Sequence, residues 1–479
     1  MRLAIAVAVV LAVLFPGSAA RAAEGEYAVV ASKATLTDAG WKAVAQVLLD
    51  KHKGRLVEYD ASVADALGKL KDPHPRYVCF VARPGEAGKQ FVADVHRLVT
   101  KIDDDPYADA FWGILTGYDA ANALRIAKHA EPLTVRKAAG GTEIALEMCQ
   151  EGLWHCELNA GKIVRKKPGG AIEESKGLAD STAALVAALN EYKADLFVTS
   201  GHATERDWQI GYRYRNGSFR PKAGQLIGYD TAGKTHAIDS PNPKVYLAVG
   251  NCLMGYIDGP DAMALAWMNS AGVHQMIAYT VPTWFGYAGW GCLDTFVEQP
   301  GRYTLAEAFL ANHHALVHRL ATEFAELAPL EPKPGQRPAM PAPTTRPARE
   351  VRLMRNFQMG LGLLHDRDVV AFYGDPAWAA RMADAPKAYD QTLSEKDGTF
   401  TFEVLPRRGD KSFAPVNTIG SQRGGRPFVQ FLPRRVGKVR IVEGQDLKPV
   451  VTDDFVLVPN PRTCDPARTY RVIFREEKQ

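Results

Sequence analysis

The sequence predicts an α/β fold, in which a mostly parallel sheet is flanked by helices, followed by an all-β domain. Residues 27–82 alternate between apolar runs and amphipathic stretches in the order strand, helix, strand, helix, strand, which is typical of a parallel sheet. Two more apolar runs, residues 196–200 and 244–249, end in turns of small residues and resemble buried strands. After residue 389 the chain consists of short alternating runs separated by Gly, Pro and Asn, as in a β-sandwich.

The same periodicities place the remaining elements. Helical spacing of apolar residues predicts helices at residues 39–51, 60–70, 91–102, 118–129, 180–191, 259–272, 305–327 and 351–364. Short apolar runs predict strands at residues 27–32, 56–59, 77–82, 273–280 and 369–373, and in the last domain at 400–404, 428–432, 438–442, 455–458 and 470–474. Residues 149–177 are rich in Gly and Lys, and we expect them to form a surface loop.

The first 22 residues have the features of a secretory signal peptide. Arg2 precedes an apolar run at residues 3–15, and Ala20, Arg21 and Ala22 form an A-x-A cleavage site. The run is too short to span a bilayer comfortably, and no later stretch is long and apolar enough. We therefore expect a protein without a membrane span that is exported to the periplasm or secreted.

Length and composition indicate a globular protein of several domains. The chain has 479 residues, of which 46% are hydrophobic and 23% are charged, and its net charge of +4 gives no reason to expect a nucleic-acid partner. The predicted boundaries are a signal peptide at 1–22, an N-terminal α/β subdomain at 23–130, a catalytic subdomain at 131–386 with a Pro-rich insertion at 328–349, and a β-sandwich at 387–479.

One histidine and one cysteine follow the two buried strands of the central region. Gly201 and His202 come after residues 196–200, and Cys252 comes shortly after residues 244–249. If these strands are parallel neighbours, both side chains lie at the carboxyl edge of the sheet, where open α/β sheets place their sites. An imidazole can take the proton of a thiol and then protonate a leaving amine. The sequence therefore predicts a hydrolase with Cys252 as the nucleophile and His202 as general acid and base.

Small residues around this pair would give a substrate room to approach. Gly201 lets a peptide backbone come close, and the backbone N–H groups of Ala203 and Cys252 are expected to form an oxyanion hole. The competing interpretation is an inert, buried thiol and a histidine that caps a turn. Six cysteines are present, and the spacing of Cys149 and Cys156 would allow a disulfide in an oxidising compartment without requiring one.

The order of these motifs resembles the gingipain family of cysteine peptidases, in the caspase-like clan. That clan places its histidine after an apolar strand, usually as His-Gly, and its cysteine after the next strand as Cys-x-x-Gly; here His202 is followed by Ala203, and Gly255 completes the second motif. The acidic turn 104–109 and the run 373–376, Tyr-Gly-Asp-Pro, also resemble the gingipain branch.

The resemblance implies a caspase-like catalytic fold, an exported endopeptidase that acts through a thioester acyl-enzyme, and an immunoglobulin-like domain at the C-terminus. It also implies that Tyr279 and Thr280, at the end of the strand after the cysteine, wall the specificity pocket. Trp284 could line an aromatic pocket or be ordinary core. Ala203 departs from the family's glycine, and its orienting acid has no clear match.

Further functions stay open on the sequence alone. The chain could be a catalytically inactive gingipain-like homologue that acts as an exported binding or scaffold protein, or a thiol acyltransferase or amidase on the same fold. His314 and His318, four residues apart on a predicted helix, could chelate zinc, although no HExxH carboxylate accompanies them. The acidic turn 103–109 could bind calcium. We expect a peptide or protein substrate, no cofactor and no catalytic metal.

Overall fold

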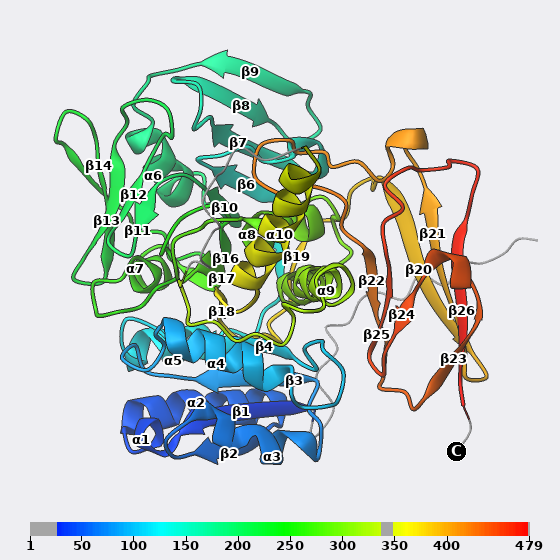
Figure 1. The fold of residues 1–479 in the computed structure, drawn as a ribbon. Coiled ribbons are helices and arrows are strands. Elements are labelled where there is room, and N and C mark those ends of the chain that lie inside the picture. Colours follow the sequence, from blue (N-terminus) through cyan, green and yellow to red (C-terminus); the bar gives the residue numbers. More distant parts are fainter. Residues whose placement is uncertain (1–25, 337–347, 478–479) are drawn as a thin grey trace, which may run out of the picture.

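A computed structural model describes residues 26–336 and 348–477, with the backbone alone for 348–356. The predicted signal peptide at 1–22 and part of the Pro-rich insertion lie outside the described residues. One twelve-stranded sheet runs through the α/β part of the chain, in the order β2-β1-β3-β4-β18-β17-β16-β10-β6-β7-β8-β9, with helices on its faces (Figure 1). No helix within the described residues is long and apolar enough to cross a bilayer. The predicted α/β class with a mostly parallel sheet is confirmed.

The N-terminal end of the sheet follows the predicted alternation of strands and helices. Its strands are β1 (Tyr27–Ser32), β2 (Arg55–Tyr59), β3 (Tyr77–Val81) and β4 (Phe111–Leu115), all parallel. Its helices are α1 (Lys33–Leu36), α2 (Ala39–His52), α3 (Leu67–Lys71), α4 (Lys89–Val99) and α5 (Ala120–Lys128). The predicted helix at 60–70 is a 3₁₀ turn, η1 (Val63–Ala66), that leads into the short α3. β4 was not predicted.

The centre of the sheet holds the two strands on which the prediction of a site depends. Its strands are β6 (Lys137–Gly140), β10 (Leu196–Thr199), β16 (Lys244–Ala248), β17 (Val273–Tyr279) and β18 (Val370–Tyr373), of which β18 is antiparallel to β17. Tyr373 of β18 pairs with Ile114 of β4 and so joins the N-terminal strands to the central ones. The predicted subdomains at 23–130 and 131–386 therefore share one sheet.

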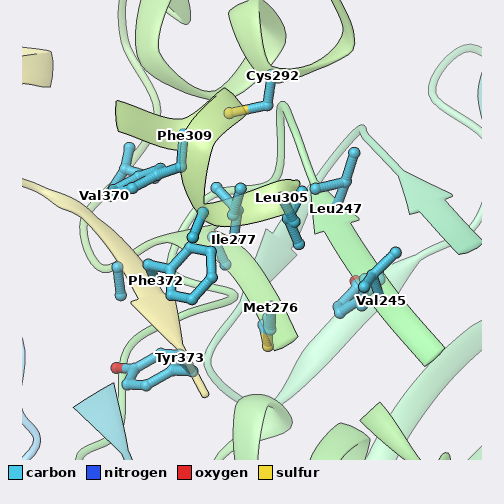
Figure 2. Close-up of a cluster of buried hydrophobic side chains, with 14 of the residues drawn as sticks. Val245, Leu247, Met276, Ile277, Cys292, Leu305, Phe309, Val370, Phe372 and Tyr373 are labelled. Carbon is cyan, nitrogen blue, oxygen red and sulfur yellow. The ribbon is translucent and has the colours of Figure 1, made fainter. Parts of the chain in front are cut away.

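The core lies between this sheet and its helices. Figure 2 shows Val245, Ile277 and Phe372 from adjacent strands, with Phe309 of α9 on the side of the cluster that holds Phe372. The helices of this part are α6 (Thr182–Asn190), α7 (Met263–Asn269), α8 (Tyr287–Cys292), α9 (Leu305–Glu323) and α10 (Ala348–Arg367), with a π-helical turn, η3 (Leu293–Val297), after α8. A capping box between Thr304 and Glu307 fixes the start of α9, because each residue satisfies a backbone N–H of the other.

Residues 149–177 correct one prediction. They form β7 (Glu151–His155), β8 (Lys162–Lys166) and β9 (Ile172–Lys176), which extend the sheet rather than looping over the surface. β9 is exposed at every residue and lies at the edge of the sheet, where charged side chains discourage pairing with another chain. The Lys-rich composition was therefore the signature of an edge and not of a loop.

A second, small antiparallel sheet follows His202. It comprises β11 (Ala203–Thr204), β12 (Asp207–Gln209), β13 (Ser218–Lys222), β14 (Gln225–Tyr229) and β15 (Thr235–Ala237). The sequence had not indicated these strands. A two-stranded sheet pairs β5 (Leu133–Val135) with β19 (Ala380–Met382).

The C-terminal part is all-β, as predicted. One sheet contains β20 (Tyr389–Lys396), β21 (Thr399–Pro406), β26 (Tyr470–Glu476) and β23 (Val439–Glu443), and the other contains β22 (Phe428–Phe431), β25 (Phe455–Val458) and β24 (Val450–Val451). The two sheets enclose a core of their own, which includes Phe402, Phe428 and Val472. That this unit is immunoglobulin-like stays a prediction. We call residues 389–477 the β-unit.

The β-unit packs against the α/β part beside α9 and β4 (Figure 1). The rings of Phe431 and Phe111 are 4.7 Å apart, and the ring of Phe455 stacks on His314 of α9 at 4.4 Å. This apolar contact is continuous with the large core of the α/β part.

Candidate active site

The register of two parallel strands brings the predicted catalytic residues to one edge of the sheet. β10 pairs with β16, and Thr199 at the end of β10 is the partner of Ala248 at the end of β16. The pairing continues one step beyond, because Val249 donates its N–H to the carbonyl of Thr199 at 3.0 Å. Both chains then turn at the carboxyl edge, and His202 and Cys252 lie on these turns.

A single buried side chain joins the two turns. Asn251 is fully buried; its Nδ2 donates to the carbonyl of Gly201 at 3.1 Å and its Oδ1 accepts from the Thr199 hydroxyl at 2.6 Å. The residue before the cysteine is thus bonded to the residue before the histidine. Sequence reasoning did not single out Asn251, although a polar residue directly after a buried strand and glycine was a usable signal.

Cys252 is partly exposed, and its turn is held against the end of β17. The sulfur accepts a hydrogen bond from the N–H of Thr283 at 3.3 Å. Leu253 has a positive φ of 58° and donates its N–H to Val281, which makes the turn tight. Gly255 donates to the carbonyl of Tyr279 at 2.8 Å. Cys252, the candidate nucleophile, therefore lies on a turn whose backbone is hydrogen-bonded to the segment at the end of β17.

His202 is exposed at the start of the small antiparallel sheet. Its ring stacks on Tyr212 with the centroids 4.7 Å apart and the planes at 27°. Gly201 before it has φ +93°, a conformation in which glycine alone is relaxed, so the turn that presents the histidine needs this residue. The carbonyl of His202 accepts from Gln209 at 2.9 Å.

A buried carboxylate that the sequence did not reveal lies beside the histidine turn. Glu157 is 6% exposed; it accepts hydrogen bonds from the hydroxyl of Ser200 and from that of Thr142, the latter at 3.1 Å. Its backbone carbonyl accepts from Tyr212, the residue that stacks on His202, at 2.6 Å. Burial raises the pKa of this carboxyl. It lies within residues expected to be a loop, so no pattern marked it.

The remaining predicted substrate residues differ in exposure. Ala203 is half-buried and begins β11. Tyr279 and Thr280 are fully buried; the Tyr279 hydroxyl donates to Asp366 at 2.9 Å and that of Thr280 to Val369 at 2.9 Å. Trp284 is partly exposed next to Thr283, which contacts the Cys252 sulfur. The ring of Trp284 lies 5.6 Å from that of His365, edge to face.

Two features that the sequence leaves open are the state of the six cysteines and the surroundings of His314 and His318. All six cysteines lie within the described residues, and each is a free thiol. His314 is buried, and burial lowers its pKa to about 3, whereas Nδ1 of His318 is 3.1 Å from the Tyr107 hydroxyl.

Three carboxylates of the predicted acidic turn come together. Ligand atoms of Asp103, Asp105 and Asp109 lie within 4.8 Å of one another. Burial, together with the negative charge of its two neighbours, raises the pKa of Asp109 to about 9. Oxygen ligands of this kind suit a hard cation; calcium binding stays a prediction.

Comparisons with known proteins find a weak likeness to solved structures and no match in sequence. No family model matches the chain, and no curated protein matches it in sequence. Among solved structures, the Arg-specific cysteine proteinase gingipain R aligns with 12% identity and a TM-score of 0.44, over 92% of this chain and 92% of the other. A complex of the Porphyromonas gingivalis RgpB pro- and mature domains aligns with 12% identity and a TM-score of 0.43, over 95% and 94%. At these values the likeness carries no argument about this chain and assigns no role to any residue.

Proposed function

We propose that the protein is an exported cysteine endopeptidase that cleaves peptide bonds with Cys252 as the nucleophile and His202 as general acid and base. The observation that supports this most is the hydrogen bond from Asn251 to Gly201, which ties together the turns that carry the two residues. The pair lies at the carboxyl edge of a largely parallel sheet, the position at which such sheets bind ligands.

Each step of the proposed reaction uses a group at this edge. The Cys252 thiolate bonds to the carbonyl carbon of the peptide, and the oxyanion accepts from the N–H groups of Ala203 and Cys252. The C–N bond breaks as His202 gives its proton to the leaving amine, which leaves a thioester on Cys252. His202 then takes a proton from water, the water oxygen bonds to the thioester carbon, and the C–S bond breaks to release the acid and the thiolate.

Two further groups would support the chemistry without reacting. The N–H of Thr283 points at the sulfur, and a charged sulfur accepts a stronger hydrogen bond than a neutral one. Glu157 holds the histidine turn through Ser200 and holds Tyr212 through its carbonyl, so it would fix the imidazole from both sides. We assign Glu157 as a positioning residue.

One observation favours a second candidate, a catalytically inactive binding or scaffold protein. The imidazole of His202 packs on the exposed ring of Tyr212, while the Glu157 carboxylate is bonded to the hydroxyls of Ser200 and Thr142. Under this second candidate the two turns present an exposed His-Tyr surface to a partner.

Substitution of two half-exposed cysteines separates these functions. Cys464 lies in the β-unit and is the matched control for Cys252, because both are partly exposed free thiols. We expect the chain without residues 1–22 to hydrolyse members of a mixed peptide library, Cys464→Ala to retain this, and Cys252→Ala to lose it. Hydrolysis that survives Cys252→Ala would overturn the proposal.

Two additions to the same assay test for different hydrolytic chemistry and for binding without cleavage. A panel of small amides and acyl acceptors beside the peptides tests for an amidase or acyltransferase, and a chelator tests for a metal hydrolase. A purified chain that binds library peptides with unchanged affinity in Cys252→Ala, and cleaves none, would favour the binding protein.

A further inference from the structure

A loop of the β-unit, residues 414–426 between β21 and β22, is fixed on the helices beside the candidate site. Arg423 forms ion pairs with Asp294 at 2.7 Å and Glu298 at 2.6 Å, and Arg426 pairs with Asp294 at 2.9 Å. All four side chains are at most 7% exposed. Breaking a buried pair leaves an uncompensated charge, so the loop has one strongly favoured position. We call residues 414–426 the bracing loop.

The bracing loop also reaches the other flank of the carboxyl edge. Ile419 donates its N–H to the carboxylate of Glu143 at 2.9 Å, and the side chain of Asn417 donates to the Glu143 carbonyl at 2.8 Å. Thr142, the residue before Glu143, donates to Glu157. The loop therefore contacts the segment that carries the acid network of His202, as well as η3 on the cysteine side.

Between the two segments that these bonds fix, the bracing loop packs against the indole of Trp290. Trp290 of α8 is 6% exposed, and glycines from two other segments, Gly420 and Gly250, lie against different atoms of its indole. A Cβ added to Gly420 of the bracing loop would lie 2.7 Å from Cζ3 of the indole and closer still to Cδ2 and Cε3. A Cβ added to Gly250 would lie 2.9 Å from Nε1 and Cζ2, a different edge of the indole. Real Cβ atoms do not approach this closely, so both contacts require glycine.

Gly250 is the residue before Asn251 and Cys252. The chain of contacts thus runs from Gly420 through Trp290 to Gly250, and from there to the Asn251 bridge and the nucleophile. Protein interiors are close-packed and have little compressibility, so a shift at one end of such a chain reaches the other.

We propose that the bracing loop positions the Cys252 turn through Trp290, so that the β-unit supports the catalytic centre from outside it. Trp290 and Gly420 are positioning residues, since neither contacts the reacting atoms. The inference rests on the proposed function for the hydrolysis that it modulates, but the placement of the thiol can be measured without hydrolysis. A domain that is merely attached would affect overall stability and leave the reactivity of Cys252 unchanged.

The experiment compares two alanine substitutions in the same loop. Gly420 and Gly425 both have positive φ, at +123° and +67°, so alanine strains the backbone at each, and more at Gly420, whose φ lies outside the left-handed region open to other residues. A Cβ on Gly425 meets nothing within 4 Å, whereas one on Gly420 meets the indole. The rate at which iodoacetamide alkylates Cys252, its pH profile, and kcat and KM for a cleaved peptide are measured beside thermal unfolding.

We expect Gly420→Ala to change the alkylation rate and its pH profile, and to lower kcat by about 10²-fold with a smaller change in KM, because small misplacements of reacting groups have effects of that order. Gly425→Ala should leave the alkylation rate, its pH profile, kcat and KM at the wild-type values. Equal alkylation rates in the two variants, whatever their unfolding temperatures, would overturn the inference.

A second variant keeps the test decisive if Gly420→Ala does not fold. Trp290→Phe removes Nε1 and Cζ2 of the indole, which lie nearest Gly250, and Cε3 and Cζ3, which lie near Gly420. Trp290→Phe by itself should change the rate of alkylation of Cys252. Adding Gly420→Ala to Trp290→Phe should have little further effect on this rate, because the effects of substitutions along one chain of contacts are not additive. Independent, additive effects of the two substitutions would contradict the positioning role. If the wild type cleaves no peptide but alkylation still separates the glycine variants, the proposed function fails and the brace stands.

Discussion

The two ends of β16 are built in opposite ways. At its start, Lys244 is fully buried, and its ammonium donates to the carbonyls of Ser240 at 2.9 Å, Asn242 at 2.8 Å, and Ala271. Burial lowers the pKa of this amine to about 7. Beyond its end, Cys252 is partly exposed, and the described contacts of its sulfur include one donor, the N–H of Thr283.

The difference shows how one strand can be both anchored and reactive. A buried amine surrounded by carbonyls has used its hydrogen-bonding capacity on the protein, and removing it leaves acceptors without partners. A sulfur and an imidazole with open sides retain theirs for a substrate. Substitutions at one end of the strand should therefore change stability, and those at the other end should change activity.

The largest expected effect is beside the reactive end of β16, on the turn after the neighbouring strand β10 that carries His202. His202→Ala should lower kcat/KM for a cleaved peptide by about 10²–10⁴-fold, the range typical of a lost general acid and base. The free energy of unfolding should change by about 0.5 kcal/mol or less, because the side chain is exposed. His236, in the small sheet and paired with Asp230 at 3.0 Å, is the control. A similar loss of activity in His236→Ala would mean that the small sheet and not the imidazole is responsible.

The anchored end should give the opposite result. Lys244→Met fills a similar volume but leaves three carbonyls without their donor, and we expect it to lower the free energy of unfolding by about 3 kcal/mol. Urea denaturation measures this, and kcat/KM per folded molecule should stay at the wild-type value. A loss of activity in folded Lys244→Met would contradict this contrast, because it would show that the start of β16 also affects activity.

The sequence predicted those features that depend on local patterns. The alternation of strands and helices indicated the parallel sheet, and the turns after β10 and β16 indicated His202 and Cys252, because apolar runs and small residues are visible along the chain. The sequence does not reveal β7, β8 and β9, because their polar composition is also typical of a loop, although strands at the edge of a sheet tolerate it. Asn251, Glu157 and Trp290 were missed for another reason: their roles depend on partners 15 to 50 residues away or more, which only the packed structure brings near.

A buried histidine extends the comparison to pH. His314 is fully buried against Phe455, and its pKa is lowered from 6.5 to about 3, so the unfolded chain binds its proton more readily than the folded one. The stability that neutral His314 contributes to the folded protein is present above its pKa in the unfolded chain, and it is lost as the pH falls toward its pKa in the folded chain. His314→Phe removes this dependence on pH. As the pH is lowered from about 7.5 to about 5, its free energy of unfolding should rise by about 2 kcal/mol relative to that of the wild type. A difference that is constant with pH would show that folding does not lower the pKa of His314.

The smallest expected effect tests whether Glu157 positions the histidine turn by its charge or only by its shape. Glu157→Gln keeps the size of the side chain and an oxygen for the Ser200 hydroxyl, so the fold should be retained and kcat/KM should fall by about 10-fold, the equivalent of about 1.4 kcal/mol. Glu151→Gln, on β7 of the same sheet, is the control. Because burial raises the pKa of Glu157, the wild-type carboxyl gains its proton at a higher pH than an exposed glutamate does and then resembles glutamine. The ratio of wild-type to Glu157→Gln activity should therefore shrink as pH falls, whereas a ratio independent of pH would assign Glu157 a purely steric role.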